Sequence, residues 1–145
     1  MKLIKVILTI VMFTVFAGCK EQAYAQKKVP DAVKSTFRSM YPGEDDPDWV
    51  IDSHGNYESK FKIDGIHYRA DFRPNGEWIE TENNIDKDDL PKAIREVIKD
   101  RFNDEDISEI EKVSHHSKGE FYDVEFKRKG KNKDVEFRAS GEIIN

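Results

Sequence analysis

The sequence predicts an α+β fold: a tandem repeat of a helix packed on a four-stranded antiparallel sheet, following an N-terminal signal peptide. Three observations support this prediction. The chain begins with a positive segment and an apolar run, two stretches offset by 61 residues share one helical pattern, and the segments after each alternate apolar with charged side chains. Alternation with a period of two is typical of strands that bury one face. We therefore assign a signal peptide to residues 1–25 and repeats to residues 26–84 and 85–145.

Residues 1–25 have the features of an export signal. Lys2 and Lys5 form a positive segment, and residues 6–17 are an uncharged, mostly apolar run. A transmembrane helix needs roughly 20 apolar residues, so this run is too short to span a bilayer but suits a signal peptide. We predict export to the periplasm or the outer membrane.

Two cleavage sites are compatible with this signal. Residues 16–19 (Phe-Ala-Gly-Cys) resemble the bacterial lipobox, in which the cysteine is lipidated and becomes the first mature residue. Residues 23–25 (Ala-Tyr-Ala) instead have the small residues of an ordinary site and would start the mature protein at Gln26. Cys19 is thus the predicted lipid attachment site of a lipoprotein, with a free periplasmic form as the alternative. It is the only cysteine of the chain, so it has no disulfide partner within it.

The charge of the mature chain limits its partners. Removal of residues 1–25 leaves 21 basic and 28 acidic side chains and a net charge of −7. An acidic body repels phosphate backbones, so we expect no nucleic-acid partner. Contact with a membrane is expected only through a lipid on Cys19. Aromatic residues make up 11% of the chain and supply the buriable area that a folded core needs.

The helix of each repeat begins with the same pattern. Residues 29–33 (Val-Pro-Asp-Ala-Val) parallel residues 90–94 (Leu-Pro-Lys-Ala-Ile) at an offset of 61. Proline suits the first turn of a helix, where a missing N–H removes no hydrogen bond. Apolar residues then recur at helical spacing in both stretches. They are Val33, Phe37 and Tyr41 in the first and Ile94, Ile98 and Phe102 in the second.

The predicted strands repeat at a different offset. Residues 57–63 and 66–72 alternate apolar and charged side chains on either side of Asp64-Gly65, a pair typical of tight hairpin turns. Tyr57, Phe61, Phe72 and Gly76 recur 65 residues later as Tyr122, Phe126, Phe137 and Gly141. We expect a last short strand around Ile143. The change of offset places a four-residue insertion between helix and sheet, where insertions cost little. So many matches in order favour an internal duplication.

These patterns together resemble a known family. The chain is similar to the PepSY-like family of small exported proteins from Bacteroidetes-type bacteria. The similarity lies in the beginnings of the two helices (29–33 and 90–94), the hairpin (57–72) and the segment Gly-Glu-Trp-Ile-Glu (76–80). That family is similar in fold to β-lactamase inhibitory protein. The resemblance covers nearly all of residues 29–145. It implies a helix-on-sheet fold and a protein-binding surface across the sheets, and it implies no catalytic residues.

The predicted binding surface is the charged face of the sheets. Side chains of both signs on one face can steer and orient a protein partner, although solubility alone also accounts for such a face. Trp49 and Trp78 would be strong anchors if exposed, but large aromatic residues are more often buried, and we expect Trp78 in the core. The residues that we assign to the surface are Glu58, Lys60, His67, Arg69, Asp71, Glu125, Glu136 and Arg138.

No motif predicts a metal, a cofactor or catalysis. His115 and His116 are adjacent on a predicted strand, so they should point to opposite faces and cannot chelate together. The acidic residues 44–48 lack the ligand spacing of an EF-hand. The serines lie in no Gly-x-Ser-x-Gly elbow, and no phosphate-binding glycine loop is present. We predict that the protein is not an enzyme.

The function predicted first is an exported cell-envelope binding module, inhibitor-like, that engages another protein or peptide through its sheet face. The alternative is a structural or stress-related envelope protein whose acidic body buffers calcium weakly.

Overall fold

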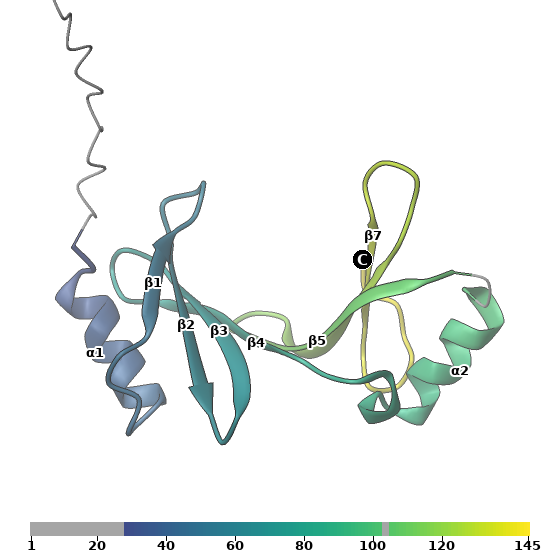
Figure 1. Ribbon diagram of the computed structural model, residues 1–145, viewed down its shortest axis with the longest axis horizontal. Helices are drawn as coiled ribbons and strands as arrows, with labels where there is room; N and C mark the ends of the chain where they lie inside the picture. The colour runs from purple at the N-terminus through teal and green to yellow at the C-terminus, as the bar shows by residue number, and fades with distance from the viewer. Residues whose placement is uncertain (1–27, 103–104) are drawn as a thin grey trace, which may run out of the picture.

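The computed structural model describes residues 28–102 and 105–145. Within them, seven strands form one antiparallel sheet in which every strand pairs with its neighbours in sequence, in the order β1 to β7 (Figure 1). Helix α1 (Asp31–Met40) precedes β1, and a short 3-10 turn (Lys87–Asp89) and helix α2 (Lys92–Arg101) separate β4 from β5. The strands are β1 (Asp48–Ile51), β2 (Tyr57–Ile63), β3 (Ile66–Phe72), β4 (Trp78–Asn84), β5 (Ile107–His115), β6 (Gly119–Phe126) and β7 (Lys133–Phe137).

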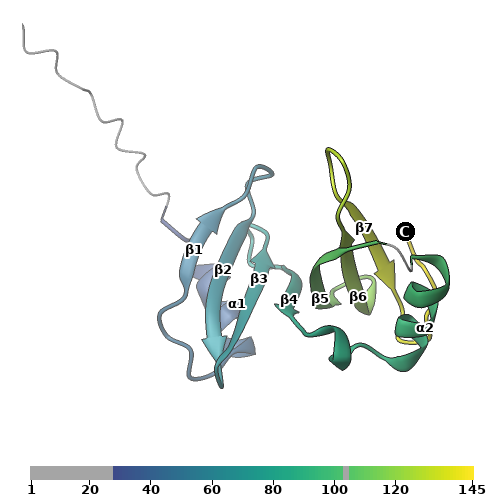
Figure 2. The same cartoon turned by 45° about the vertical axis from the view of Figure 1, so that its right-hand side comes forward.

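Both helices cover the same face of this sheet. Ala70 of β3 lies opposite Thr81 of β4, Thr81 lies opposite Ser114 of β5, and Ser114 lies opposite Glu120 of β6. Residues that lie opposite one another in paired strands share a face. The buried side chains of β3 and β6 therefore point the same way, with α1 over the first strands and α2 beside the last ones (Figure 2).

Two separate apolar clusters, one under each helix, form most of the core. Val113 and Phe121 are also buried, on the other face of the sheet. Under α1, the ring of Phe37 meets those of Phe61 and Trp49 edge-on, at centroid distances of 5.1 and 5.4 Å. Under α2, the rings of Phe102 and Phe126 stack at 4.6 Å. Each fully buried aromatic side chain contributes about 1.5–3 kcal/mol through burial, so these clusters hold the helices in place. The expectation that Trp78 belongs to the core is confirmed, because it packs against the first cluster.

The strand pattern was predicted correctly, but the way the strands assemble was not. The prediction of two four-stranded sheets is wrong, because β4 and β5 pair with each other over five residue pairs, from Glu80 with His115 to Asn84 with Glu111. The sheet therefore continues across the predicted boundary between residues 84 and 85. The expected last strand is reduced to one bridge between Ile143 and Phe137. Alternation identifies a strand and its buried face, but it does not say which strand edges will meet.

The two halves share one contact between a turn and a helix start. Gly76 has a φ of +91°, and a Cβ there would lie 2.9 Å from the backbone carbon and oxygen of Ala32 in α1. Gly141 makes the equivalent approach to Ala93 in α2, where a Cβ would lie 3.0 Å from the backbone oxygen. Only glycine combines this positive φ with so close a contact. Each turn thereby sets the position of its helix on the sheet.

Replacement of Gly76 by alanine tests this contact. We expect Gly76→Ala to lower the free energy of unfolding by about 1–2 kcal/mol for the positive φ and by about 1–3 kcal/mol more for the clash with α1. Gly55→Ala is the matched control, because Gly55 has a φ of +87° and nothing within 4 Å of its Cβ position. Urea unfolding of both variants measures the difference, and equal losses would show that the contact with α1 adds nothing.

Candidate protein-binding surface

The face of the sheet opposite the helices carries charged side chains on strands β2 to β7, interrupted by the buried pair Val113 and Phe121 on β5 and β6. Strand alternation and register place all of the predicted surface residues on this one face, although they lie in both halves of the chain. Their role in binding stays a prediction. They come from four strands and the residue after the last of them: Glu58 and Lys60 in β2, His67, Arg69 and Asp71 in β3, Glu125 in β6, Glu136 in β7, and Arg138 directly after β7.

Three carboxylates stand side by side on β2, β3 and β4. Glu58 lies opposite Asp71, and Asp71 lies opposite Glu80. Like charges directly opposite one another destabilise a sheet. Burial, followed by the charges of Glu58 and Glu80, raises the pKa of Asp71 to about 7. Burial also raises the pKa of Glu80, with a further contribution from Glu82. Lys60 pairs with Glu58 at 3.1 Å, whereas no ion pair is formed by Asp71 or Glu80 among the described residues.

One arginine sits next to this row and connects three strands. Arg69 of β3 pairs with Glu82 of β4 and, at 3.1 Å from Nη2 to Oε1, with Glu111 of β5. The side chains of both glutamates are only 13% exposed. The pKa of Glu111 is nevertheless raised, first by burial and then by Glu82. A single guanidinium does not balance two partly buried carboxylates, so the site remains acidic.

The acidic character continues into the second half of the sheet. Asp123 of β6 lies opposite Glu111 on one side and Glu136 on the other. Burial, followed by the charges of Asp134 and Glu136, raises the pKa of Asp123 to about 6. Its Oδ1 atom is buried and accepts no hydrogen bond from the described residues. Lys118 is the cation on this side, bonded to Glu136 at 2.6 Å.

We call these seven carboxylates the acidic face. They form one group only because β4 pairs with β5. The members not assigned from the sequence lie at alternating positions of β4, β5 and β6, but the strand register that joins them depends on the tertiary structure. The acidic face consists of Glu58, Asp71, Glu80, Glu82, Glu111, Asp123 and Glu136.

Other predicted surface residues are occupied locally. Arg138 donates to the backbone oxygens of Lys118 and Glu120, at 2.6 and 2.8 Å, and so holds the β5–β6 turn. Glu125 accepts hydrogen bonds from Ser108 and Asn132, which lower its pKa. Both residues lie on the charged face, but these contacts show that they stabilise the local structure.

The prediction for the histidine pair is wrong in its geometry. His115 and His116 do not point to opposite faces; their rings stack at a centroid distance of 4.6 Å. β5 ends at His115, so strand alternation does not apply to His116. Burial lowers the pKa of His115, and the neighbouring His116 lowers it further. Across residues 28–102 and 105–145, no three His, Cys, Asp or Glu side chains are placed to share a metal ion.

The fold agrees with the comparisons to known proteins. Residues 55–145 match a family model with the provisional description beta-lactamase-inhibitor-like, PepSY-like. The chain belongs to the PepSY-like family. Its family is described by likeness to an inhibitor and not by a reaction. No curated protein sequence matches the chain.

Solved structures from Bacteroides share the fold of this PepSY-like protein. A DUF2874 family protein from Bacteroides ovatus has a TM-score of 0.72 at 18% identity, over 81% of this chain and 86% of that one. A BLIP-like protein from Bacteroides fragilis has a TM-score of 0.69 at 19% identity, over 80% and 84%. A protein from Bacteroides eggerthii, provisionally described as periplasmic, has a TM-score of 0.71 at 20% identity, over 81% and 87%. At these identities the likeness extends to the fold.

The export signal and Cys19 lie outside the described residues. Within the described part of the chain, neither helix has the length and apolar character to cross a bilayer.

Asp71 provides a test of the electrostatics of the acidic face. A carboxyl whose pKa is raised by folding stabilises the protein below its unfolded pKa, near 4, and loses that contribution as the pH rises towards 7. We expect the protein to be more stable at pH 5 than at pH 8. Asp71→Asn should raise the free energy of unfolding at pH 8 by about 1 kcal/mol, after solvent screening is allowed for, and reduce the difference between the two pH values.

Asp100→Asn is the control for this prediction, because it removes an exposed carboxyl from α2. Thermal unfolding at both pH values gives the comparison. An unchanged pH dependence in Asp71→Asn would show that this carboxyl is not under electrostatic strain.

Proposed function

We propose that this PepSY-like protein is an exported binding module whose acidic face engages a basic segment of another protein. The observation that carries the proposal is the row formed by Glu58, Asp71 and Glu80. The free protein keeps three carboxylates side by side at a cost in stability, and a positively charged partner would remove that cost.

The depth of the acidic face favours a specific partner over solvation alone. Glu82 and Glu111 have exposed fractions of only 13%, so a cation that reaches them is shielded from solvent. Opposite charges attract more strongly in such a setting than in bulk water. A lysine or arginine side chain placed near Asp71 would also lower the pKa of that carboxyl and release a proton. Binding of a basic segment should therefore be stronger at pH 8 than at pH 5.

The family and the predicted export signal support the same function. The family description refers to inhibitor-like proteins, and a protein of the same fold carries a provisional assignment to the periplasm. An inhibitor acts by covering a surface of its target, which requires an accessible face with specific charges. We propose that the acidic face has this role in the cell envelope, with the duplication as the origin of its two halves.

Differential capture from a cell-envelope extract tests the proposed function. We expect a stoichiometric protein partner to bind the wild-type protein and to be lost with the double variant Asp71→Asn/Glu80→Gln. The control is Glu96→Gln/Asp100→Asn, which changes the net charge equally but on exposed positions of α2. Quantitative mass spectrometry of the captured proteins measures the difference. A partner retained equally by both double variants would contradict the role of the acidic face.

Lipidation of Cys19 is a separate prediction. We expect radioactive palmitate to label the wild-type protein in cells and not the Cys19→Ala variant, which should move from the membrane fraction to the soluble periplasm. N-terminal sequencing of the mature protein is the independent readout. A mature wild-type chain that begins at Gln26 would show that the protein is released without a lipid.

A further inference from the structure

Strand β1 forms one edge of the sheet, and its hydrogen-bonding pattern identifies the groups that face outwards. The N–H of Asp52 donates to the oxygen of Asn56 at 3.0 Å, immediately beyond the pair Ile51–Tyr57. In an antiparallel ladder, pairs that exchange hydrogen bonds alternate with pairs that do not. Val50 therefore bonds to Glu58, whereas the N–H and C=O groups of the residues on either side of Val50 point away from β2.

These outward groups belong to Trp49 and Ile51. The hairpin between β2 and β3 supports the assignment, because Ile63 and Ile66 flank the two-residue turn as a hydrogen-bonded pair, which directs the groups of Glu58 towards β1. Among the described residues, no side chain or backbone group bonds to the N–H or C=O of Trp49 or Ile51. Outside the ladder, these groups are open to a partner.

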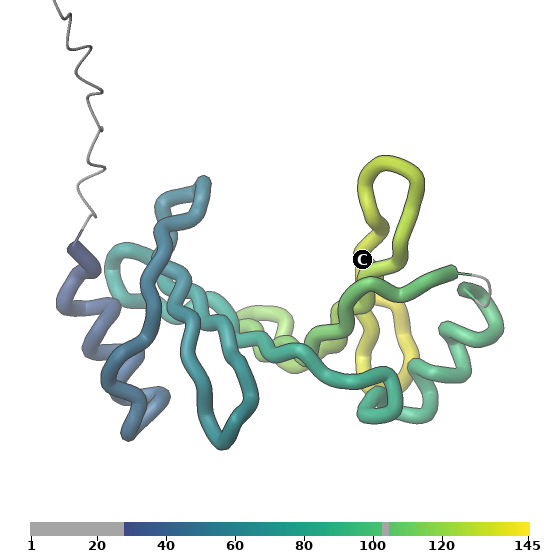
Figure 3. The backbone as a smooth tube through the Cα atoms, in the orientation of Figure 1, coloured from purple at the N-terminus to yellow at the C-terminus, as the bar shows by residue number. Residues whose placement is uncertain are grey.

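At the opposite edge of the sheet, the outward backbone groups of β7 have hydrogen-bond partners. The chain end returns beside β7 (Figure 3). The N–H of Arg138 donates to Glu142, and the oxygen of Glu136 accepts from Ile144, at 2.8 and 3.0 Å. The side chain of Asn145 accepts from the N–H of Glu136 at 2.9 Å. The fold thus covers the outward groups of β7 and leaves those of β1 uncovered.

The β1 edge carries few of the features that prevent strand addition. Native edges are blunted by lysine, proline, bulges or short length. The four residues of β1 include neither lysine nor proline, and Val50 and Ile51 have exposed fractions of 47% and 37%. Its protections are the charge of Asp48 at its start and its short length, which limits an added strand to the hydrogen bonds of Trp49 and Ile51. A specific partner therefore needs an additional contact.

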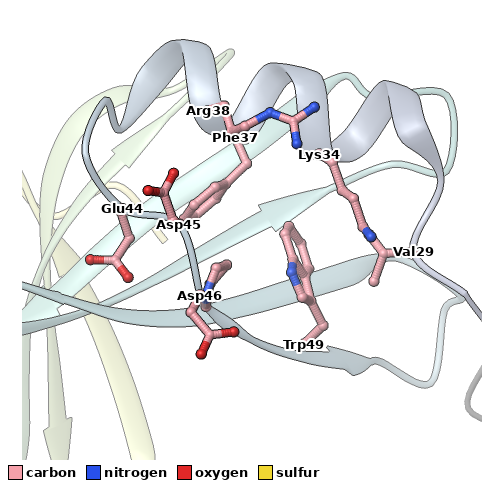
Figure 4. Close-up of a pocket in the computed structure, with 9 residues that line it drawn as sticks. Val29, Lys34, Phe37, Arg38, Glu44, Asp45, Asp46 and Trp49 are labelled. Carbon is pink, nitrogen blue, oxygen red and sulfur yellow. The ribbon is translucent and has the colours of Figure 1, made fainter.

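A cavity next to this edge offers that contact. It has a volume of about 230 Å³ and lies between α1 and the start of β1 (Figure 4). The rings of Phe37 and Trp49 form its apolar part, with Lys34 and Arg38 on the helix side and acidic residues 44–46 on the loop side. Pockets for drug-sized ligands measure about 300–1,000 Å³, so this cavity is better matched to a single side chain.

We propose that the β1 edge and this cavity together form a second binding site, which takes an extended peptide segment of another protein as an added strand. The backbone of the peptide bonds to Trp49 and Ile51. A peptide residue opposite Trp49 has its side chain on the same face as the indole, so an aromatic or aliphatic side chain there enters the cavity. Backbone bonds supply affinity, and the cavity selects the residue.

A separate peptide fits this edge better than a second copy of the chain. Antiparallel pairing of β1 with itself, centred on Val50, would place Asp48 of each copy opposite Asp52 of the other. Like charges directly opposite one another are destabilising. The site also differs from the acidic face, because the side chains of Trp49 and Ile51 lie on the helix side of the sheet. The two proposals can therefore fail separately.

Selection of short random peptides displayed on phage, with the mature protein as bait, tests the proposal. We expect enriched peptides with an aromatic or aliphatic anchor. Ile51→Pro should weaken their binding about tenfold, because it removes an outward N–H without removing a bond to β2. Ile51→Thr is the matched control, since it loses the same exposed apolar side chain but keeps the N–H, and its affinity should fall much less.

Two further measurements make the result decisive. Hydrogen exchange should show that peptide binding protects the amides of Trp49 and Ile51. N-methylation of the peptide at alternate residues should abolish its binding to the wild-type protein, and this test does not depend on whether the proline variant folds. Asp71→Asn/Glu80→Gln should leave peptide binding unchanged. The proposal is overturned if no peptides are enriched, if the proline and threonine variants bind equally, or if peptide binding protects other amides.

Discussion

The pairing of β4 with β5 is the interaction on which the rest of the structure depends. Each helix has its own apolar cluster, and the two clusters do not merge. The halves are joined by the ladder from Glu80–His115 to Asn84–Glu111 and by the ion pairs of Arg69, which reach from β3 to β5. Without that ladder, β4 and β5 would each expose a row of unpaired backbone groups. The joined sheet satisfies them and makes one molecule out of two similar units.

The same pairing creates the acidic face. Glu58, Asp71 and Glu80 belong to the first half, and Asp123 and Glu136 belong to the second. They become one surface because the sheet runs continuously between them. The cost of bringing them together appears as raised pKa values near neutrality, with burial as the main cause. Strongly perturbed pKa values cluster at functional sites in proteins. The proposed basic partner would compensate this cost.

The edges of the sheet add a second asymmetry to this duplicated pattern. At β7 the last residues of the chain bond to the edge, in the place that β4 takes beside β3. At β1 the groups of Trp49 and Ile51 meet no described partner, and a cavity lined by aromatic rings lies next to them. A protein with an acidic face on one side of its sheet and an open edge at its end can hold a partner by two different kinds of contact, charge on the face and backbone at the edge.

The sequence by itself determined the strands, the helices and their buried faces, because alternation and helical spacing depend only on local geometry. The hairpin around Asp64-Gly65 and the buried positions Phe37 and Ile98 followed directly from these patterns. Local geometry did not reveal that His116 leaves the strand, or that the units form one sheet of seven strands. Only the tertiary structure decided which edges pair. That choice depends on contacts between residues far apart in the chain, and it placed Glu82 and Glu111 on one arginine.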